Sequence, residues 1–146
     1  MDGTYYIKSY FSNLYLDVAN GSASNNANIQ QYSFLGTDRQ KFKLVKGSDG
    51  YYTIYTGASG YSKVVDVVKK STADGANILQ YAYKGTTNQK FEIAEVKSGV
   101  YAIKTRITNG ASCLDVYGRS TANGGNIAQY TYWGGDCQLW YLEKIN

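Results

Sequence analysis

Proline and histidine are both absent from this chain of 146 residues, and it has only two cysteines, Cys113 and Cys137. Without histidine the chain lacks the commonest metal ligand, and the spacing of its two thiols is not that of a zinc finger. It also lacks the histidine that activates the nucleophile in serine hydrolases. We therefore expect no metal, no cofactor and no such catalytic centre. Whether the two cysteines form a disulfide stays open at this point.

Long apolar runs are missing too. No segment approaches the ~18 apolar residues of a membrane span, so we expect no membrane insertion. The opening residues, Met1 to Thr4, are not the start of a signal peptide. The protein is then expected to be cytoplasmic, exported by another route, or a domain of a larger secreted chain, in which case it is extracellular.

Charge is scarce and weakly biased. Charged residues make up 18% of the chain and the net charge is +4, with the pair Lys69-Lys70 as the densest basic point. Binding to a phosphate backbone requires a concentrated basic face. We therefore expect no nucleic-acid partner.

Tyrosine and glycine are abundant, at 16 residues each, and hydrophobic residues reach 43%. This is the composition of one folded domain rather than of a disordered chain. Tyrosine has an apolar ring and a polar tip, so its abundance favours half-buried strands or contact surfaces.

An internal repeat of 49 residues runs through the whole chain and divides it into residues 1–48, 49–97 and 98–146. Four residue types recur at that step without a gap. They are Asp17, Asp66 and Asp115; Asn28, Asn77 and Asn126; Tyr32, Tyr81 and Tyr130; and Gln40, Gln89 and Gln138.

Each repeat reads as four short strands separated by turns, because β-branched and aromatic residues alternate with polar ones. The expected strands surround Ile7, Ile54 and Ile103, then cover 16–18, 65–67 and 114–116, then begin at Ile29 and its counterparts, and finally cover 40–44, 89–93 and 138–142. No window has a helical stripe, so the fold class is all-β.

Three four-stranded units restrict the architecture. A propeller typically needs four to eight blades, and an open solenoid needs polar end caps that these repeats do not have. A closed barrel with threefold pseudo-symmetry, the β-trefoil, fits the count and leaves few free strand edges. We therefore expect residues 1–146 to form a single β-trefoil domain.

The period of two along a strand predicts where the repeated side chains point. Leu16 and Val18 share one face, which places Asp17 on the other, and Tyr32 faces away from the interior as well. Each repeat is thus expected to expose one carboxylate beside one aromatic ring.

The segments Gln40-Lys41-Phe42, Gln89-Lys90-Phe91 and Gln138-Leu139-Trp140 resemble the thrice-repeated Gln-x-Trp motif of ricin-type lectins. They also resemble the related family 13 carbohydrate-binding modules of plant-polysaccharide hydrolases. The resemblance covers essentially the whole chain, and it rests on three motifs in register, each with its upstream aspartate and tyrosine.

This resemblance implies a sugar-binding site in each repeat. It assigns the sugar hydroxyls to Asp17, Asp66 and Asp115, the stacking ring to Tyr32, Tyr81 and Tyr130, and a polar contact to Arg39, Asn88 and Cys137. Because a thiol is a poor partner, the third site is the doubtful one, although Tyr117 offers it a second aromatic wall. The motif glutamines Gln40, Gln89 and Gln138 belong to the site, but a structural role is favoured for them, as it is for the repeated asparagines.

The chemistry of these residue types suits a sugar, because a ring can cover the apolar face of a pyranose while a carboxylate accepts from its hydroxyls. We expect a non-catalytic module that binds glycans, and galactose-type sugars are the leading expectation. Up to three weak sites then act together by avidity. The alternatives are a xylan- or arabinan-targeting module from a secreted glycoside hydrolase, with the catalytic domain elsewhere in the parent chain, and a protein-interaction or protease-inhibiting trefoil.

Overall fold

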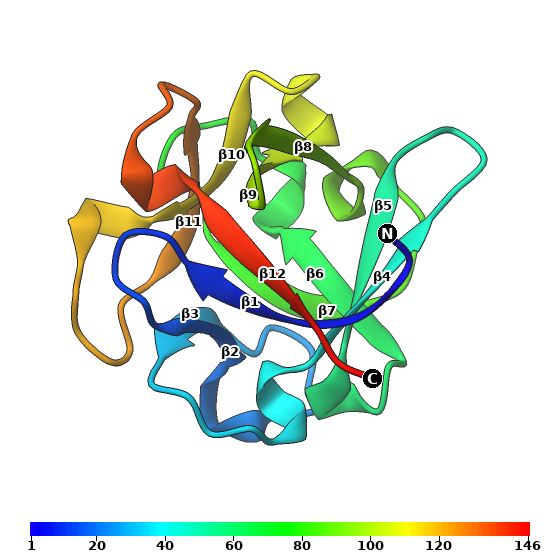
Figure 1. Ribbon diagram of the computed structural model, residues 1–146. Helices are drawn as coiled ribbons and strands as arrows, with labels where there is room; N and C mark the ends of the chain where they lie inside the picture. The colour runs from blue at the N-terminus through cyan, green and yellow to red at the C-terminus, as the bar shows by residue number, and fades with distance from the viewer.

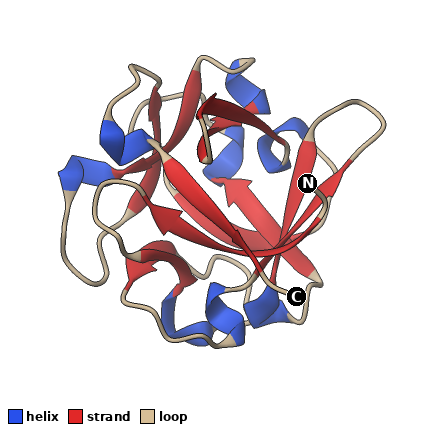
Figure 2. Cartoon of the chain, in the orientation of Figure 1, coloured by secondary structure: helices blue, strands red, loops and turns tan.

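The computed structural model describes residues 1–146 and contains twelve strands and eight short 3₁₀ turns but no α-helix (Figures 1 and 2). The strands are β1 (Gly3–Ser9), β2 (Tyr15–Val18), β3 (Ile29–Tyr32), β4 (Phe42–Lys46), β5 (Tyr52–Thr56), β6 (Lys63–Val67), β7 (Ile78–Ala82), β8 (Phe91–Lys97), β9 (Val100–Thr105), β10 (Ser112–Val116), β11 (Ile127–Thr131) and β12 (Trp140–Lys144). No helix of the fold is long and apolar enough to cross a membrane.

Six of the strands close a barrel. Strand β1 pairs with β4 and β12, β5 pairs with β4 and β8, and β9 pairs with β8 and β12, all antiparallel. The last strand therefore lies beside the first, from Tyr5 opposite Lys144 to Ser9 opposite Trp140. Figure 1 shows this red and blue pair crossing the front of the barrel. Closure leaves no free edge in this ring.

The other six strands form three hairpins, β2–β3, β6–β7 and β10–β11, one from each repeat. Each hairpin is attached to the barrel through its own repeat, by a pairing of β2 with β1, β6 with β5, and β10 with β9. A six-stranded barrel with three hairpins at threefold-related positions is the β-trefoil that the repeat predicts.

The repeats fill one interior cluster of 19 buried residues with equivalent side chains. Phe42, Phe91 and Trp140, the last residues of the three Gln-x-Phe/Trp motifs, are all fully buried there. Each such burial contributes on the order of 1.5–3 kcal/mol. The threefold pattern of the sequence is thus also the pattern of the core.

A ring of amide hydrogen bonds joins the three repeats. Asn28 Nδ2 donates to Asn126 Oδ1 (2.8 Å), Asn126 Nδ2 to Asn77 Oδ1 (2.9 Å), and Asn77 Nδ2 to Asn28 Oδ1 (2.8 Å), which closes the cycle. Each asparagine therefore acts once as donor and once as acceptor. The structural role predicted for these residues is confirmed.

Buried glutamines make a second set of contacts between repeats. Gln80 Nε2 donates to the carbonyls of Ser22 and Ser24, at 3.0 and 2.9 Å, and its Oε1 accepts from Thr56 Oγ1 at 2.7 Å. Gln31 is bonded in the same way to the third repeat and to Ser12. These amides replace the water that the loop carbonyls would otherwise need.

The twelve strands lie where the sequence predicts them, with one correction. The fourth strand of each repeat does not begin at the motif glutamine. Gln40, Gln89 and Gln138 instead end the 3₁₀ turns η2 (Asp38–Gln40), η5 (Thr87–Gln89) and η8 (Asp136–Gln138). The cysteines, left open above, are both free and buried.

Gln129 provides a test of the glutamine contacts, because its Oε1 is buried without a partner while its Nε2 bonds to two carbonyls. We expect Gln80→Ala to lower the free energy of unfolding by about 1 kcal/mol more than Gln129→Ala, since it removes one additional hydrogen bond from a site of the same shape. Urea denaturation of both variants measures this difference. Equal losses would contradict it.

Candidate functional site

The motif glutamine satisfies its whole amide within one loop. In the second repeat, Gln89 Nε2 donates to Asp66 Oδ2 at 2.8 Å and to the carbonyl of Ala82 at 2.9 Å. Its Oε1 accepts from the backbone amides of Lys84 and Gly85 at 2.7 and 3.2 Å. The same four bonds recur around Gln40 and around Gln138. The glutamine therefore fixes both the loop and the aspartate.

The aspartates are less exposed than the strand alternation predicts. Asp17 is 0% exposed, and Asp66 and Asp115 are each 5% exposed. The prediction that each repeat exposes its carboxylate is therefore wrong. The motif glutamine instead binds one oxygen of each carboxylate. The repeats differ in what lies next to the second oxygen of the carboxylate, Oδ1.

In the second repeat a pocket of about 310 Å³ opens over Asp66. Tyr81 from β7 and Asn88 from η5, the residues that the sequence assigns to the same site, line it together with the aspartate. Asn88 is held by its own bonds, since Nδ2 donates to the carbonyl of Val67 and Oδ1 accepts from the hydroxyl of Thr86. Gln89 occupies Asp66 Oδ2 and leaves Oδ1 for a donor in the pocket.

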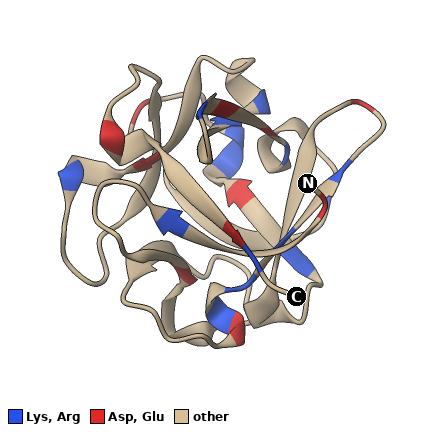
Figure 3. Ribbon diagram, in the orientation of Figure 1, with Lys and Arg blue, Asp and Glu red and all other residues tan.

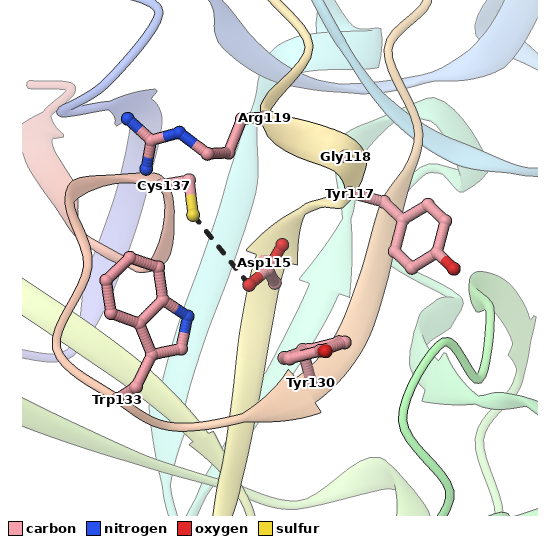
Figure 4. Close-up of a pocket in the computed structure, with 7 residues that line it drawn as sticks. All are labelled: Asp115, Tyr117, Gly118, Arg119, Tyr130, Trp133 and Cys137. Carbon is pink, nitrogen blue, oxygen red and sulfur yellow. Dashed lines mark hydrogen bonds between the residues drawn. The ribbon is translucent and has the colours of Figure 1, made fainter.

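In the third repeat a pocket of about 370 Å³ surrounds Asp115. Figure 4 shows the carboxylate between Trp133 on one side and Tyr117 and Tyr130 on the other. The Sγ of Cys137 lies 3.9 Å from Asp115 Oδ2, the oxygen that also accepts from Gln138. Here too, Oδ1 accepts no hydrogen bond from the protein.

The first repeat has no pocket, because Arg39 occupies the corresponding space. Its Nε lies 3.1 Å from both oxygens of Asp17, and its Nη2 lies 2.9 Å from Oδ1. The guanidinium carbon is also 5.4 Å from the centre of the Tyr32 ring. Arg39 thus fills both positions that a ligand would need, the carboxylate and the ring face. Asp17, Tyr32 and Arg39 are brought together, but as a closed internal contact.

Burial changes the acidity of the two open sites. Removal of water raises the pKa of Asp66 and of Asp115 above the usual aspartate value, and the hydrogen bonds from Gln89 and Gln138 oppose that rise without cancelling it. Each pocket has only one carboxylate among its lining residues. Hydrolysis of a glycosidic bond usually requires two carboxylates in one cleft.

Sequence reasoning missed several lining residues. Trp133 lies in the third-repeat pocket and is 60% exposed, yet its counterparts in the repeat are Leu35 and Lys84, so comparison of the repeats did not reveal it. The sequence marks Lys69 and Lys70 only as a pair of like charges, and in the structure they line the second-repeat pocket. The signal that the sequence offers is a tryptophan followed by two glycines, Trp133-Gly134-Gly135.

A sequence profile described as ricin-type beta-trefoil lectin domain-like matches residues 1–81 and 87–146 of the chain. The chain belongs to this family. A search among curated proteins finds no relative of the domain. Nothing in the fold adds a metal centre, since no three side chains of the metal-binding types cluster together.

Solved structures share the fold of this lectin-like domain. The designed threefold symmetric protein ThreeFoil superposes with a TM-score of 0.92 at 42% identity, covering 99% of this chain and 100% of that one. An exo-beta-1,3-galactanase from Clostridium thermocellum gives 0.91 at 33% identity, covering 98% of this chain and 30% of that one. A ricin B-like lectin from Macrolepiota procera, solved with lactose, gives 0.82 at 18% identity over 99% of this chain and 96% of that one.

The Arg39–Asp17 contact yields a stability prediction for the lectin-like domain. We expect Arg39→Ala to lower the free energy of unfolding by about 1.5–3 kcal/mol, because it leaves Asp17 buried without its cation. Lys41→Ala is the matched control, since Lys41 pairs with Asp38, whose side chain is 75% exposed, and such pairs contribute at most about 1 kcal/mol. Guanidinium denaturation distinguishes them, and equal effects would refute the closed contact.

Proposed function

We propose that the chain binds carbohydrate through the second- and third-repeat pockets, with the third taking a neutral galactose-type sugar. The observation that supports this proposal most strongly is that Asp115 Oδ1 has no partner in the protein and lies beside three partly exposed rings. They are Tyr117 at 49%, Tyr130 at 38% and Trp133 at 60% exposure. A carboxylate accepts strongly from sugar hydroxyls, while aromatic rings cover the apolar face of a pyranose.

The solved relatives support a galactose-type ligand. The Macrolepiota procera protein was solved with lactose, and an earthworm R-type lectin of the same fold was solved with GalNAc. The galactanase, 33% identical over this domain, is named for an activity on a galactose polymer. These ligands share a galactose-type ring.

Two pockets on separate repeats favour multivalent glycans. Each pocket is open to solvent, so we expect a dissociation constant near the millimolar end of the scale for a single sugar. A glycan or cell surface that carries several sugars engages both pockets, and avidity then raises the apparent affinity. The domain itself serves as a binding module without catalysis.

A second candidate is a polysaccharide-targeting module. It is favoured by the galactanase, in which the matched region is 30% of a longer enzyme chain. In that arrangement the parent protein is secreted, a separate domain performs the hydrolysis, and the trefoil holds the enzyme on its polymer. Binding to insoluble galactan, xylan and arabinan tests this candidate.

Substitution of the aspartates tests which repeats bind. Asparagine keeps the size of aspartate and an oxygen for the motif glutamine, but it removes the charge. We expect Asp115→Asn to weaken lactose binding at the third-repeat pocket at least about tenfold, the effect of one charged hydrogen bond. An NMR titration that follows the indole N–H of Trp133 measures it.

Asp17→Asn is the matched control for that experiment. It changes the same position of the repeat, but Arg39 closes its site, so lactose binding should match that of the parent chain. Loss of binding in Asp17→Asn, or full binding in Asp115→Asn, would contradict the assignment of the sites.

The raised pKa of Asp115 predicts the pH dependence of binding. The ionised carboxylate is the acceptor, so affinity is complete above the pKa and is lost as the pH falls through it. Because the pKa is raised, the loss begins at a higher pH than for an ordinary aspartate near 3.9, and it approaches about tenfold per pH unit. Lactose titrations between pH 7 and pH 4 measure it, with circular dichroism to confirm folding. An affinity that stays constant or rises would contradict the role of the carboxylate.

A further inference from the structure

The second- and third-repeat pockets share an aspartate, a tyrosine and a loop, but they differ in charge. The third-repeat pocket is lined by Asp115 and by Arg119, which is itself paired with Asp136 at 2.8 Å. The second-repeat pocket is lined by Asp66 and three lysines, Lys69, Lys70 and Lys84. Its lining therefore carries a formal charge of +2, out of +4 for the whole chain.

The three lysines form none of the four salt bridges of the structure, although the charge of Lys84 is near enough to Asp66 to oppose the rise in the pKa of that carboxyl. Figure 3 shows basic and acidic residues interspersed along the ribbon, and the residues outside this pocket carry a net charge of only +2. Unpaired cations around an open pocket attract an anion, and the walls of the pocket focus their field.

Two of the three lysines stand where the third-repeat pocket has an uncharged residue, since Lys69 corresponds to Gly118 and Lys84 to Trp133, while Lys70 corresponds to Arg119. Lys84 replaces Trp133, and its ammonium lies over the Tyr81 ring, 5.7 Å from the ring centre. Val68 replaces Tyr117. The second-repeat pocket thus has two fewer aromatic walls and gains positive charge in their place.

The backbone at Lys69 and Lys70 gives an independent indication. Both residues have left-handed φ angles, 51° and 56°. The same turn is built from Asn20 and Gly21 in the first repeat and from Gly118 and Arg119 in the third, so only the second repeat lacks both asparagine and glycine, the residue types that adopt this conformation readily. Two consecutive lysines are a poor choice for the turn, and strain of this kind concentrates at functional sites.

We propose that the second-repeat pocket binds an anionic saccharide, one whose ring carries a carboxylate or a sulfate. This inference rests on the proposed carbohydrate-binding function and specifies the ligand of one of its two sites. Asp66 Oδ1 and Asn88 bind the hydroxyls, Tyr81 covers part of the ring, and the ammonium groups of Lys69, Lys70 and Lys84 bind the acidic group. The domain then recognises a glycan that contains both neutral and acidic sugars.

The test is an NMR titration of the whole domain with four ligands: methyl galactoside, galacturonate, galactose-6-sulfate and inorganic sulfate. Amide shifts around Tyr81 and Asn88 report on the second-repeat pocket, and the indole of Trp133 reports on the third. We expect galacturonate or galactose-6-sulfate to bind the second-repeat pocket at least about fivefold more tightly than the neutral galactoside at 20 mM salt. The preference should shrink at 300 mM salt, where charges are screened over a few ångströms.

Lys69→Asn combined with Lys70→Gly is the decisive variant. It copies the turn of the first repeat, so the backbone is preserved while two charges are removed. We expect the preference for the acidic sugar to fall below about twofold. Lys43→Gln with Lys46→Gln, two exposed lysines outside both pockets, removes the same charge and should keep the preference.

Each remaining outcome has a clear meaning. Equal binding of neutral and acidic sugars at the second-repeat pocket, or a preference that survives Lys69→Asn/Lys70→Gly, overturns this inference and leaves the proposed function intact. Inorganic sulfate that binds as tightly as the acidic sugars also overturns it, because the pocket would then be only an ion site. Failure of every sugar to shift Trp133 or the second-repeat amides would instead reject the proposed function.

Discussion

The hydrogen bond from the motif glutamine to the aspartate is the contact on which the candidate site depends. In all three repeats it is 2.8–2.9 Å long and joins Gln Nε2 to Asp Oδ2. The other proton of the same amide and its two oxygen lone pairs hold the loop above the strand. One side chain thus sets the shape of the pocket, orients the carboxylate and leaves a single oxygen for an outside partner.

That remaining oxygen has a different fate in each repeat. In the first repeat Arg39 takes it, and no pocket remains. In the second repeat it opens into a pocket with three lysines, and in the third it lies among three aromatic rings. The repetition secures the barrel through equivalent core residues and the ring of Asn28, Asn77 and Asn126, while the side chains that vary between repeats make the three sites chemically distinct.

The sequence alone predicts the fold nearly in full, because a period of 49 residues fixes the number of units and strand alternation fixes the buried face. It also identifies the aspartates, the tyrosines and the structural asparagines. It does not predict that the aspartates are covered, since that depends on a 3₁₀ turn whose geometry strand alternation does not contain. It likewise misses Trp133 and Lys84, because they occupy a position of the repeat that is not conserved between copies and is brought to the pocket only by the fold of the loop.

In the first repeat, Arg39 occupies the place that a ligand would take in the other two repeats. A guanidinium that binds both carboxylate oxygens and lies over a tyrosine ring satisfies the contacts that the other two repeats hold open. The count of pockets therefore follows from one residue per repeat, at positions 39, 88 and 137, rather than from the motif itself. A chain can keep three motifs for the stability of its loops and use fewer of them for binding.

A crystal structure of the domain grown with lactose tests the central claim most directly. The account predicts a galactose ring in the third-repeat pocket, with a hydroxyl within hydrogen-bond distance of Asp115 Oδ1, and Arg39 still bound to Asp17. A sugar bound in the first repeat, or one bound on the domain without contact to either open aspartate, would contradict it.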